Sequence, residues 1–145
     1  MKVRIPNILS KKISSSFDVY EIMKTVYFRQ NKLHRQKEYF WVIGLNNASD
    51  ILYIELIAIG SLNKVSVDPV EVFSFAVAKK CKRIILVHNH PSNNPEPSKA
   101  DIKFMDEFVR GGKLLRIDIV DHIIITEIGY SSFKDLKYLD KNSKL

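Results

Sequence analysis

The sequence predicts an α/β protein in which helices flank a mixed β-sheet, giving a three-layer sandwich. Apolar, β-prone segments alternate with helix-like segments along the chain, the pattern typical of this class. The segment 83–88 (RIILVH) is almost continuously apolar, as expected for a strand that is covered on both faces. The apolar runs 39–45 and 51–59 are joined by the turn-forming residues NNASD, which indicates a hairpin and therefore antiparallel pairing in the same sheet.

The first two helices are predicted from their caps and periodicity. Residues 18–30 place apolar side chains on one stripe of a helix, and Ser16 or Asp18 is expected to be its N-cap. The Asp68-Pro69 pair begins a second helix that runs to about Lys80, because proline is favoured at the first helical position.

The C-terminal third is predicted to contain a helix, a strand and a short final helix. Residues 98–109 read as a helix that ends at Gly111-Gly112, since glycine commonly terminates helices. Residues 117–126 (IDIVDHIIIT) are rich in isoleucine and valine, which favours a strand. Ser131 or Ser132 is expected to begin the last helix.

Length and composition are those of one soluble domain. The chain has 145 residues, of which 46% are hydrophobic and 27% charged, enough for a single core. No apolar run approaches the ~18 residues that span a membrane, and no signal peptide is recognisable, so a cytoplasmic location is expected. The single cysteine, Cys81, excludes an internal disulfide and a cysteine-rich zinc site.

The net charge of +7 is concentrated at the N-terminus. Residues 1–37 hold nine basic and two acidic side chains, whereas residues 38–145 hold equal numbers of each. We therefore expect a basic N-terminal helical appendage over 1–37 and a neutral metal-binding domain over 38–145. The appendage could contact nucleic acid or another acidic partner. A solvated helix face is the alternative, and it is favoured because no aromatic–basic interleaving or docking motif is present.

The chemistry is predicted to lie in the segment His88-Asn89-His90-Pro91 and in Ser98-x-x-Asp101. His88 ends an apolar strand, and residues i and i+2 of an extended chain point to the same side, so His88 and His90 can face one point. Asp101 falls in the first turn of the next helix. Two imidazoles and a carboxylate suit Zn²⁺, and three protein ligands leave a fourth position for water.

Each part of this pattern also has an ordinary structural explanation. A His-x-His pair alone is common, and Ser98 followed three residues later by Asp101 is a normal helix capping box. Glu55 lies in the apolar segment ILYIELIAI, where a carboxylate is costly unless it is paired, protonated or near a cation. Glu55 could instead point to solvent from an edge strand. Because the three features occur in one chain, we expect Glu55 to be the base that takes a proton from a zinc-activated water.

These residues resemble the JAMM (MPN+) metalloprotease signature, and the sequence around them is similar to the RadC-type JAB domain over roughly residues 37–136. The similarity rests on dispersed segments that occur in the expected order, which are ELIAIGSLN from Glu55, VDPVEV from Val67, ILVHNHPS from Ile85, Pro97-Ser98-x-x-Asp101, Leu115 and DHII from Asp121. The family usually has glycine where this chain has Asn93, a residue that tolerates a left-handed backbone. The chain resembles a short, stand-alone form without the helix–hairpin–helix region.

The resemblance implies a JAB/MPN architecture, which is cytidine-deaminase-like, and a zinc-dependent hydrolysis of amide or isopeptide bonds. By position, His88, His90 and Asp101 would bind zinc, and Glu55 would be the general acid and base. Ser98 would donate a hydrogen bond to the developing oxyanion. The substrate would be a protein or peptide that the sequence does not identify.

Other functions remain open at this point. A RadC-type protein associated with DNA repair or mobile elements could bind nucleic acid and use zinc only structurally or in a DNA-linked role. A deaminase is disfavoured, because it requires Pro-Cys-x-x-Cys and this chain has one cysteine. An HNH nuclease is also disfavoured, because that name describes dispersed residues. His122 could touch a metal ligand, although a structural histidine is the commoner situation.

Overall fold

The computed structural model describes residues 2–3, 11–29, 33–60 and 67–139, and it confirms the predicted fold class. Five strands form one mixed sheet in the order β2-β1-β3-β4-β5, in which β3 and β4 are parallel and the other neighbours antiparallel. The elements are α1 (Ser16–Phe28), β1 (Glu38–Leu45), β2 (Ile51–Gly60), α2 (Pro69–Ala78), β3 (Arg83–Asn89), α3 (Lys99–Leu115), β4 (Asp118–Ile125) and β5 (Tyr130–Ser132), with a 3₁₀ turn at His34–Gln36.

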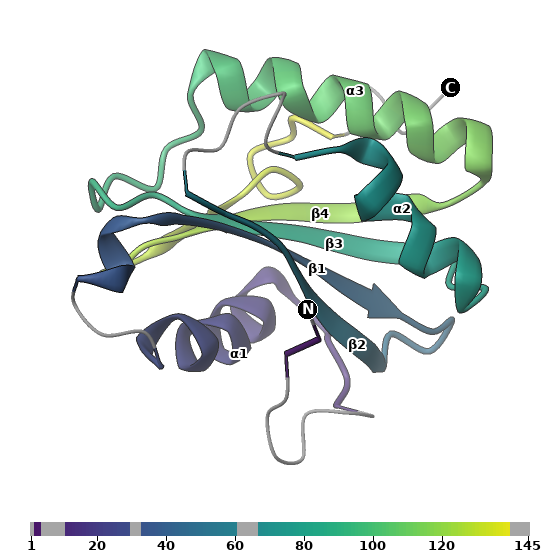
Figure 1. Cartoon of the computed structure of the whole chain (residues 1–145), viewed down its shortest axis with the longest axis horizontal. Coiled ribbons are helices and arrows are strands. Elements are labelled where there is room, and N and C mark those ends of the chain that lie inside the picture. Colours follow the sequence, from purple (N-terminus) through teal and green to yellow (C-terminus); the bar gives the residue numbers. More distant parts are fainter. Residues whose placement is uncertain (1, 4–10, 30–32, 61–66, 140–145) are drawn as a thin grey trace.

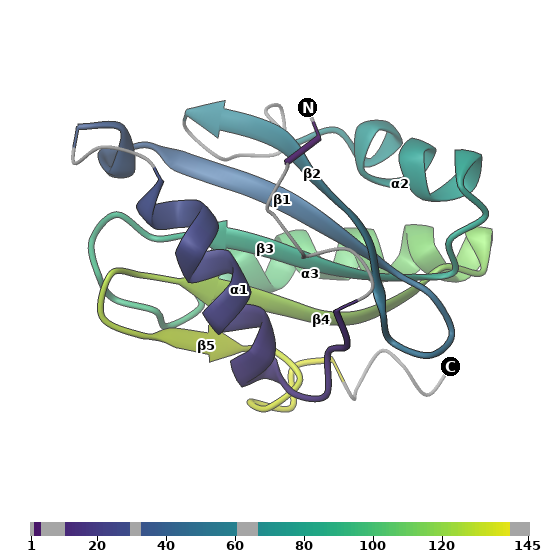
Figure 2. The ribbon, with the colours of Figure 1, turned by 90° about the horizontal axis from the view of Figure 1, so that it is seen from below.

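Helices cover both faces of the sheet (Figure 1). α2 and α3 lie on one face, and α1 crosses the other (Figure 2). Strand β3 shows how the sequence builds both layers, because Ile84 and Leu86 pack under α2 and α3 while Ile85 and Val87 pack under α1. No helix in the described ranges combines the length and the apolar character that crossing a membrane would require.

The basic N-terminal segment contributes a layer of this sandwich. Six side chains of α1 are buried, and Met23 has no exposed surface. Arg35, also in this segment, lies 3.3 Å from the Glu127 carboxylate and over the ring of Phe28. The boundary at residue 37 and the contact with nucleic acid stay predictions.

The start of α1 differs from the prediction. Its N-cap is Ser15 rather than Ser16 or Asp18. The Asp18 carboxylate instead accepts hydrogen bonds from the backbone amides of Ser14 and Ser15, at 2.8 and 3.2 Å. An acidic residue three positions after the cap satisfies amides that the first turn leaves without helical partners.

The prediction that α3 ends at Gly111-Gly112 is wrong. The helix runs to Leu115 and ends at Arg116, which has a left-handed backbone with φ 58°, and the Ile117 amide returns to the Gly112 carbonyl at 2.8 Å. A Cβ on Gly112 would lie 2.5 Å from the Ile117 carbonyl oxygen. Glycine is present there because the chain passes close to the helix, not because the helix stops.

The predicted last helix is also wrong. Tyr130–Ser132 form the short strand β5, which pairs with Ile123–Ile125 of β4, and turns follow from residue 133 to 139. The amide of Phe133 still bonds to the carbonyl of His122 at 2.9 Å. Serine often caps a helix, but Ser131 and Ser132 belong to the edge strand of the sheet, because pairing with β4 satisfies their backbone groups.

Candidate metal centre

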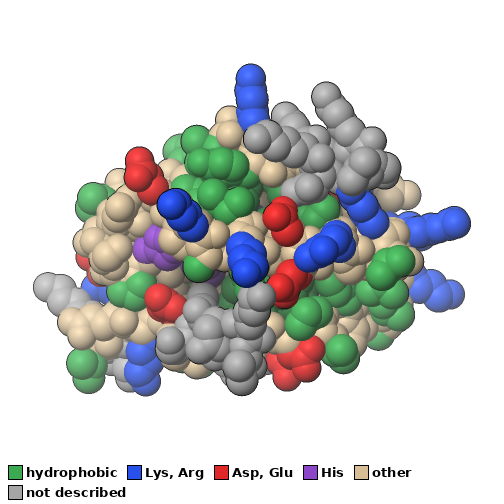
Figure 3. All heavy atoms as spheres, turned by 90° about the horizontal axis from the view of Figure 1, so that it is seen from above, with side chains coloured by type: hydrophobic (Ala, Val, Ile, Leu, Met, Phe, Trp, Pro, Cys, Tyr) green, Lys and Arg blue, Asp and Glu red, His purple; other side chains and the backbone are tan. Residues whose placement is uncertain are grey.

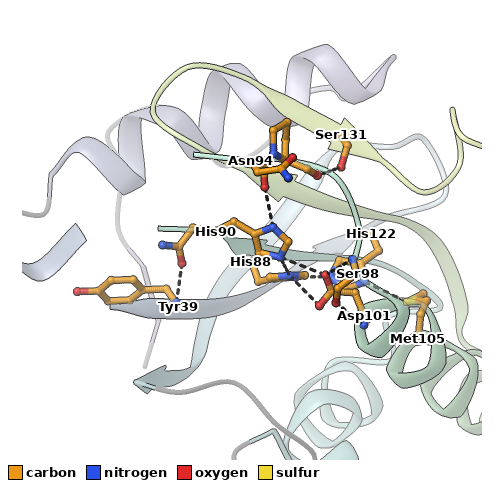
Figure 4. Close-up of polar contacts among 11 residues, drawn as sticks. Tyr39, His88, His90, Asn94, Ser98, Asp101, Met105, His122 and Ser131 are labelled. Carbon is orange, nitrogen blue, oxygen red and sulfur yellow. Dashed lines mark hydrogen bonds and ion pairs between the residues drawn. The ribbon is translucent and has the colours of Figure 1, made fainter. Parts of the chain in front are cut away.

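His88, His90 and Asp101 converge where β3 ends and α3 begins, as Figure 4 shows. They are the group of described residues whose ligand atoms could hold a metal ion. His88 is 5% exposed, while His90 and Asp101 are partly accessible from solvent. Successive side chains of a strand point to opposite faces of the sheet, and Ile84 and Leu86 of β3 point toward α3. His88, two residues after Leu86, therefore also faces α3.

The separations between the ligand atoms fit a tetrahedral metal site. His88 Nε2 lies 3.2 Å from His90 Nε2 and 3.5 Å from Asp101 Oδ1, and His90 Nε2 lies 3.1 Å from Asp101 Oδ2. Zinc bonds of ~2.0–2.1 Å in a tetrahedron hold neighbouring ligand atoms about 3.3 Å apart. The three side chains therefore need little movement to bind such an ion.

His90 is oriented by the loop that follows it. Its Nδ1 donates to the Asn94 carbonyl at 2.8 Å, so a neutral His90 has its lone pair on Nε2. Asn93, at the position where glycine is usual in the family, has φ 65°, and its side-chain oxygen accepts from the Glu127 amide at 3.2 Å. Asparagine thus maintains the left-handed turn, as the sequence suggested, and also ties the loop to the end of β4.

Ser98 and Asp101 form the predicted capping box at the start of α3. The Ser98 hydroxyl accepts from the Asp101 amide at 3.0 Å, and the Asp101 carboxylate accepts from the Ser98 amide at 2.9 Å. The structural and the functional explanations of this pair are compatible. The Asp101 carboxylate makes the cap and also faces both imidazoles, and the Ser98 hydroxyl still has its own hydrogen to donate.

The local electrostatics favour a cation between the three side chains. Burial alone would raise the pKa of Asp101, but its contacts with the imidazoles of His88 and His90 outweigh burial and hold that pKa well below its usual range. Burial also opposes protonation of His90, yet the Asp101 carboxylate and the Asn94 carbonyl raise its pKa. Positive charge, whether a proton or a metal ion, is stabilised at this point.

Glu55, the residue expected to be the base, lies on the same face of the sheet as this cluster, on a strand that does not adjoin β3. It is opposite Val42 in β1, and Val42 is opposite Leu86 in β3, one side-chain row before His88. Strand β1 therefore lies between the strand of Glu55 and the strand of the candidate ligand His88. On its outer side, Glu55 forms a β-bridge with Lys2.

Glu38 is a carboxylate that the sequence reasoning missed. Phe40 pairs with His88 across β1 and β3, so the same antiparallel register continued by two residues brings Glu38 opposite His90. Its charge contributes to the raised pKa of His90. An acidic residue before an apolar strand is unremarkable in a sequence, and only the strand register connects it to the site.

The residue between the two histidines holds the backbone on both sides of Glu38. Asn89 is fully buried, its Oδ1 accepts from the Tyr39 amide at 2.6 Å, and its Nδ2 donates to the Lys37 carbonyl at 2.9 Å. One residue of the His-Asn-His segment thus fixes the start of β1 against the end of β3.

His122 lies against the cluster from behind. It is fully buried on β4, and its Nε2 is 2.6 Å from Nδ1 of His88. Burial, together with the nearby His88, lowers its pKa, which favours the neutral imidazole. The sequence left two explanations of His122 open, and the structure places it in direct contact with one of the three candidate ligands.

An open hollow adjoins the cluster. It has a volume of about 460 Å³ and is lined by Glu38, His90, the loop from Pro91 to Glu96, and Ser98. A second hollow of about 440 Å³ shares Glu38 and Pro91 with it and reaches Ile59 and Gly60 at the end of β2. Histidine side chains reach the surface on the side of the molecule that α2 and α3 cover (Figure 3).

Comparison with known proteins gives a family. The model of the RadC-like JAB domain matches residues 13–138. UPF0758 proteins of Methanosarcina mazei and Methanosarcina acetivorans are each 46% identical over 125 residues, which cover 86% of this chain and 52% of theirs. A UPF0758 protein of Alkaliphilus metalliredigens is 48% identical over 100 residues, 69% of this chain and 43% of its own. The chain spans about half the length of these relatives. With the family matched from before α1 to beyond β5, this chain belongs to the RadC-like JAB domain family.

Proposed function

We propose that this chain is a zinc-dependent hydrolase that cleaves amide or isopeptide bonds in a protein or peptide. One observation carries the proposal. Three potential ligand atoms, His88 Nε2, His90 Nε2 and an Asp101 oxygen, converge at tetrahedral spacing beside an open hollow that Glu38 and Ser98 line. A structural zinc is normally closed by four protein ligands, whereas three ligands and an open side are typical of a catalytic one.

The reaction needs two further groups besides the metal. Zinc held by these ligands would supply an acidified water as nucleophile and a Lewis acid for the scissile carbonyl. A carboxylate in the hollow would take the proton from the nucleophile and return it to the leaving amine. The Ser98 hydroxyl accepts the Asp101 amide, so its hydrogen remains available for the oxyanion that develops on the carbonyl.

The positions of the two carboxylates favour Glu38 over Glu55 as the proton carrier. Glu38 lines the hollow together with His90 and Ser98, and the Asn89 side chain holds the backbone on either side of it. Glu55 lies on the edge strand one side-chain row away from His88. A general base must come within hydrogen-bond reach of the proton that it removes, directly or through one water.

The shape of the surface supports an extended substrate. The two hollows share Glu38 and Pro91, so together they continue from the loop of residues 91–98 to the end of β2. A peptide in an extended conformation could lie along them with its scissile bond beside His90. Flanking residues on both sides of that bond would then contact the protein.

The experiment compares Glu38→Gln with Glu55→Gln, two isosteric changes that serve as controls for each other. The zinc-loaded proteins are incubated with a peptide library from a digested proteome, and mass spectrometry counts new amino termini. We expect wild type and Glu55→Gln to cleave. Glu38→Gln should keep one zinc by elemental analysis and lose about a hundredfold or more of the rate, the usual contribution of a general acid and base.

Two outcomes would contradict parts of this assignment. If Glu55→Gln abolishes cleavage and Glu38→Gln does not, Glu55 is the base. If zinc-loaded wild type produces no new amino termini above the level of the double variant Glu38→Gln/Glu55→Gln, the hydrolase proposal itself fails.

A further inference from the structure

The two candidate histidine ligands are held in different ways. His90 donates its Nδ1 hydrogen to a backbone carbonyl of its own loop. His88 instead has His122 behind it, an imidazole that lies across the parallel β3–β4 pair, where Leu86 and His122 are register partners. A ring nitrogen can donate or accept, so the contact between His88 and His122 does not by itself define which of them carries the hydrogen.

The group on the far side of His122 removes this ambiguity. Nδ1 of His122 lies 3.2 Å from the thioether sulfur of Met105, on α3 (Figure 4). A thioether has no hydrogen to donate and can only accept, weakly. The hydrogen of a neutral His122 therefore belongs on Nδ1, and its Nε2 carries a lone pair.

The tautomer of His122 then determines the tautomer of His88. His122 Nε2 is an acceptor, so the hydrogen in the 2.6 Å contact belongs to His88 Nδ1. A neutral His88 with its hydrogen on Nδ1 has a lone pair on Nε2, the atom that faces His90 and Asp101. The opposite tautomer would place a hydrogen on His88 Nε2 and block metal binding.

Aromatic packing holds the His122 ring in the orientation that this arrangement needs. The ring stacks on Phe133, with centroids 4.6 Å apart and planes inclined by 19°. Phe40 meets His122 edge-on at 6.0 Å and lies parallel to the His88 ring at 6.3 Å. The His122 ring has no exposed surface, so Met105 and His88 are its polar contacts within the described residues.

We propose that His122 is a positioning residue that fixes the tautomer and orientation of His88 by accepting its Nδ1 hydrogen, so that His88 Nε2 is preset for the metal. This inference rests on the proposed metal site and adds to it a buried imidazole in the place where carboxylates or carbonyls commonly support a ligand histidine. Met105 takes part as the acceptor that sets the tautomer of His122.

The first test is direct and needs no substitution. Long-range ¹H–¹⁵N correlation spectra of the metal-free wild type distinguish Nδ1–H from Nε2–H in each histidine. We expect His122 with its hydrogen on Nδ1. A spectrum that shows His122 with its hydrogen on Nε2 would overturn the proposal, whatever the variants do.

The second test measures zinc affinity by competition with a chelator. His122→Phe keeps a ring of similar size and removes the acceptor, and we expect it to bind zinc about 10- to 100-fold more weakly, the usual effect of losing such a partner. His122→Gln restores an oxygen acceptor near the position of Nε2 and should recover most of that loss. The Co²⁺ absorption spectrum of His122→Phe should also change, because the ligand ring is less constrained.

Asp121→Asn is the matched control, because Asp121 is the buried neighbour of His122 but points to the other face of the sheet. It should bind zinc as wild type does. If His122→Phe binds zinc within twofold of wild type, or His122→Gln is as weak as His122→Phe, the positioning role is wrong. If wild type itself binds no zinc, the proposed metal site fails instead, so the two failures are distinguishable.

Discussion

The two faces of the sheet are built from the same strands but carry different chemistry. On the α1 face the alternation through Tyr39, Trp41, Ile85 and Val87 is aromatic or aliphatic, and in β3 it ends in Asn89, an amide that holds the start of β1. On the α2–α3 face the same alternation is apolar through Ile84 and Leu86 and ends in His88. The candidate site is formed where an apolar row reaches the end of the sheet and its last position is occupied by the candidate ligand His88.

Strand β4 shows the same contrast in two adjacent buried residues. Asp121 faces the α1 side and accepts hydrogen bonds from the Ser132 hydroxyl, the Lys134 amide and the His122 amide. His122 faces α3 and contacts a candidate metal ligand and a thioether. The Asp121 carboxylate thus has its hydrogen-bond partners within the scaffold, whereas the His122 imidazole belongs to the surroundings of the candidate metal site. Substitutions on the two faces should therefore separate stability from metal binding.

The largest effect is expected from Asp101→Asn on the metal face. Asparagine can keep the cap on the Ser98 amide, but it removes the anionic ligand, so zinc affinity should fall on the order of a thousandfold. The free energy of unfolding without metal should change by only about 1 kcal/mol, the size of a helix-terminus charge effect. Chelator competition and urea unfolding measure the two quantities. Zinc binding at wild-type strength would show that Asp101 is not a ligand.

The next largest effect is expected from Met23→Ala on the α1 face. Met23 has no exposed surface, and truncation of such a side chain costs about 3 kcal/mol in the free energy of unfolding. Zinc affinity of the folded protein should stay within twofold of wild type. A tenfold weaker affinity would mean that the two faces are coupled through the sheet, and the contrast drawn above would not hold.

The smallest effect concerns Asp121 and depends on pH. Burial raises its pKa to about 6 despite its hydrogen bonds, from an ordinary value of 3.8. The stability that this carboxyl contributes is complete below 3.8 and is lost as pH rises through 6. Asparagine does not titrate, so the stability of wild type relative to Asp121→Asn should fall by roughly 1 kcal/mol between pH 5 and pH 7. Urea unfolding at both values measures this, and an unchanged difference would contradict the raised pKa.

The parts of the molecule that the sequence predicted well are those encoded locally. The order of strands and helices up to β4 follows from local patterns, and the capping box at Ser98 and the convergence of His88, His90 and Asp101 follow from residue spacing within one strand–loop–helix unit. Glu38 and His122 reach the site only through strand pairing, which no local pattern reveals. Gly112 was misread for a similar reason, because a glycine that admits a neighbouring carbonyl looks the same in a sequence as one that ends a helix.

The connection between His88 and Asp101 has a consequence for the order in which this protein matures. The three candidate ligands lie in β3, in the loop that follows it and in α3, so closing that short loop is enough to bring them together. Glu38 comes from β1 and arrives only when distant parts of the chain have paired, which is the slower kind of contact to form. If the proposed function holds, a nascent chain binds its metal ion before Glu38 reaches the site, and hydrolytic activity begins only when the sheet is complete.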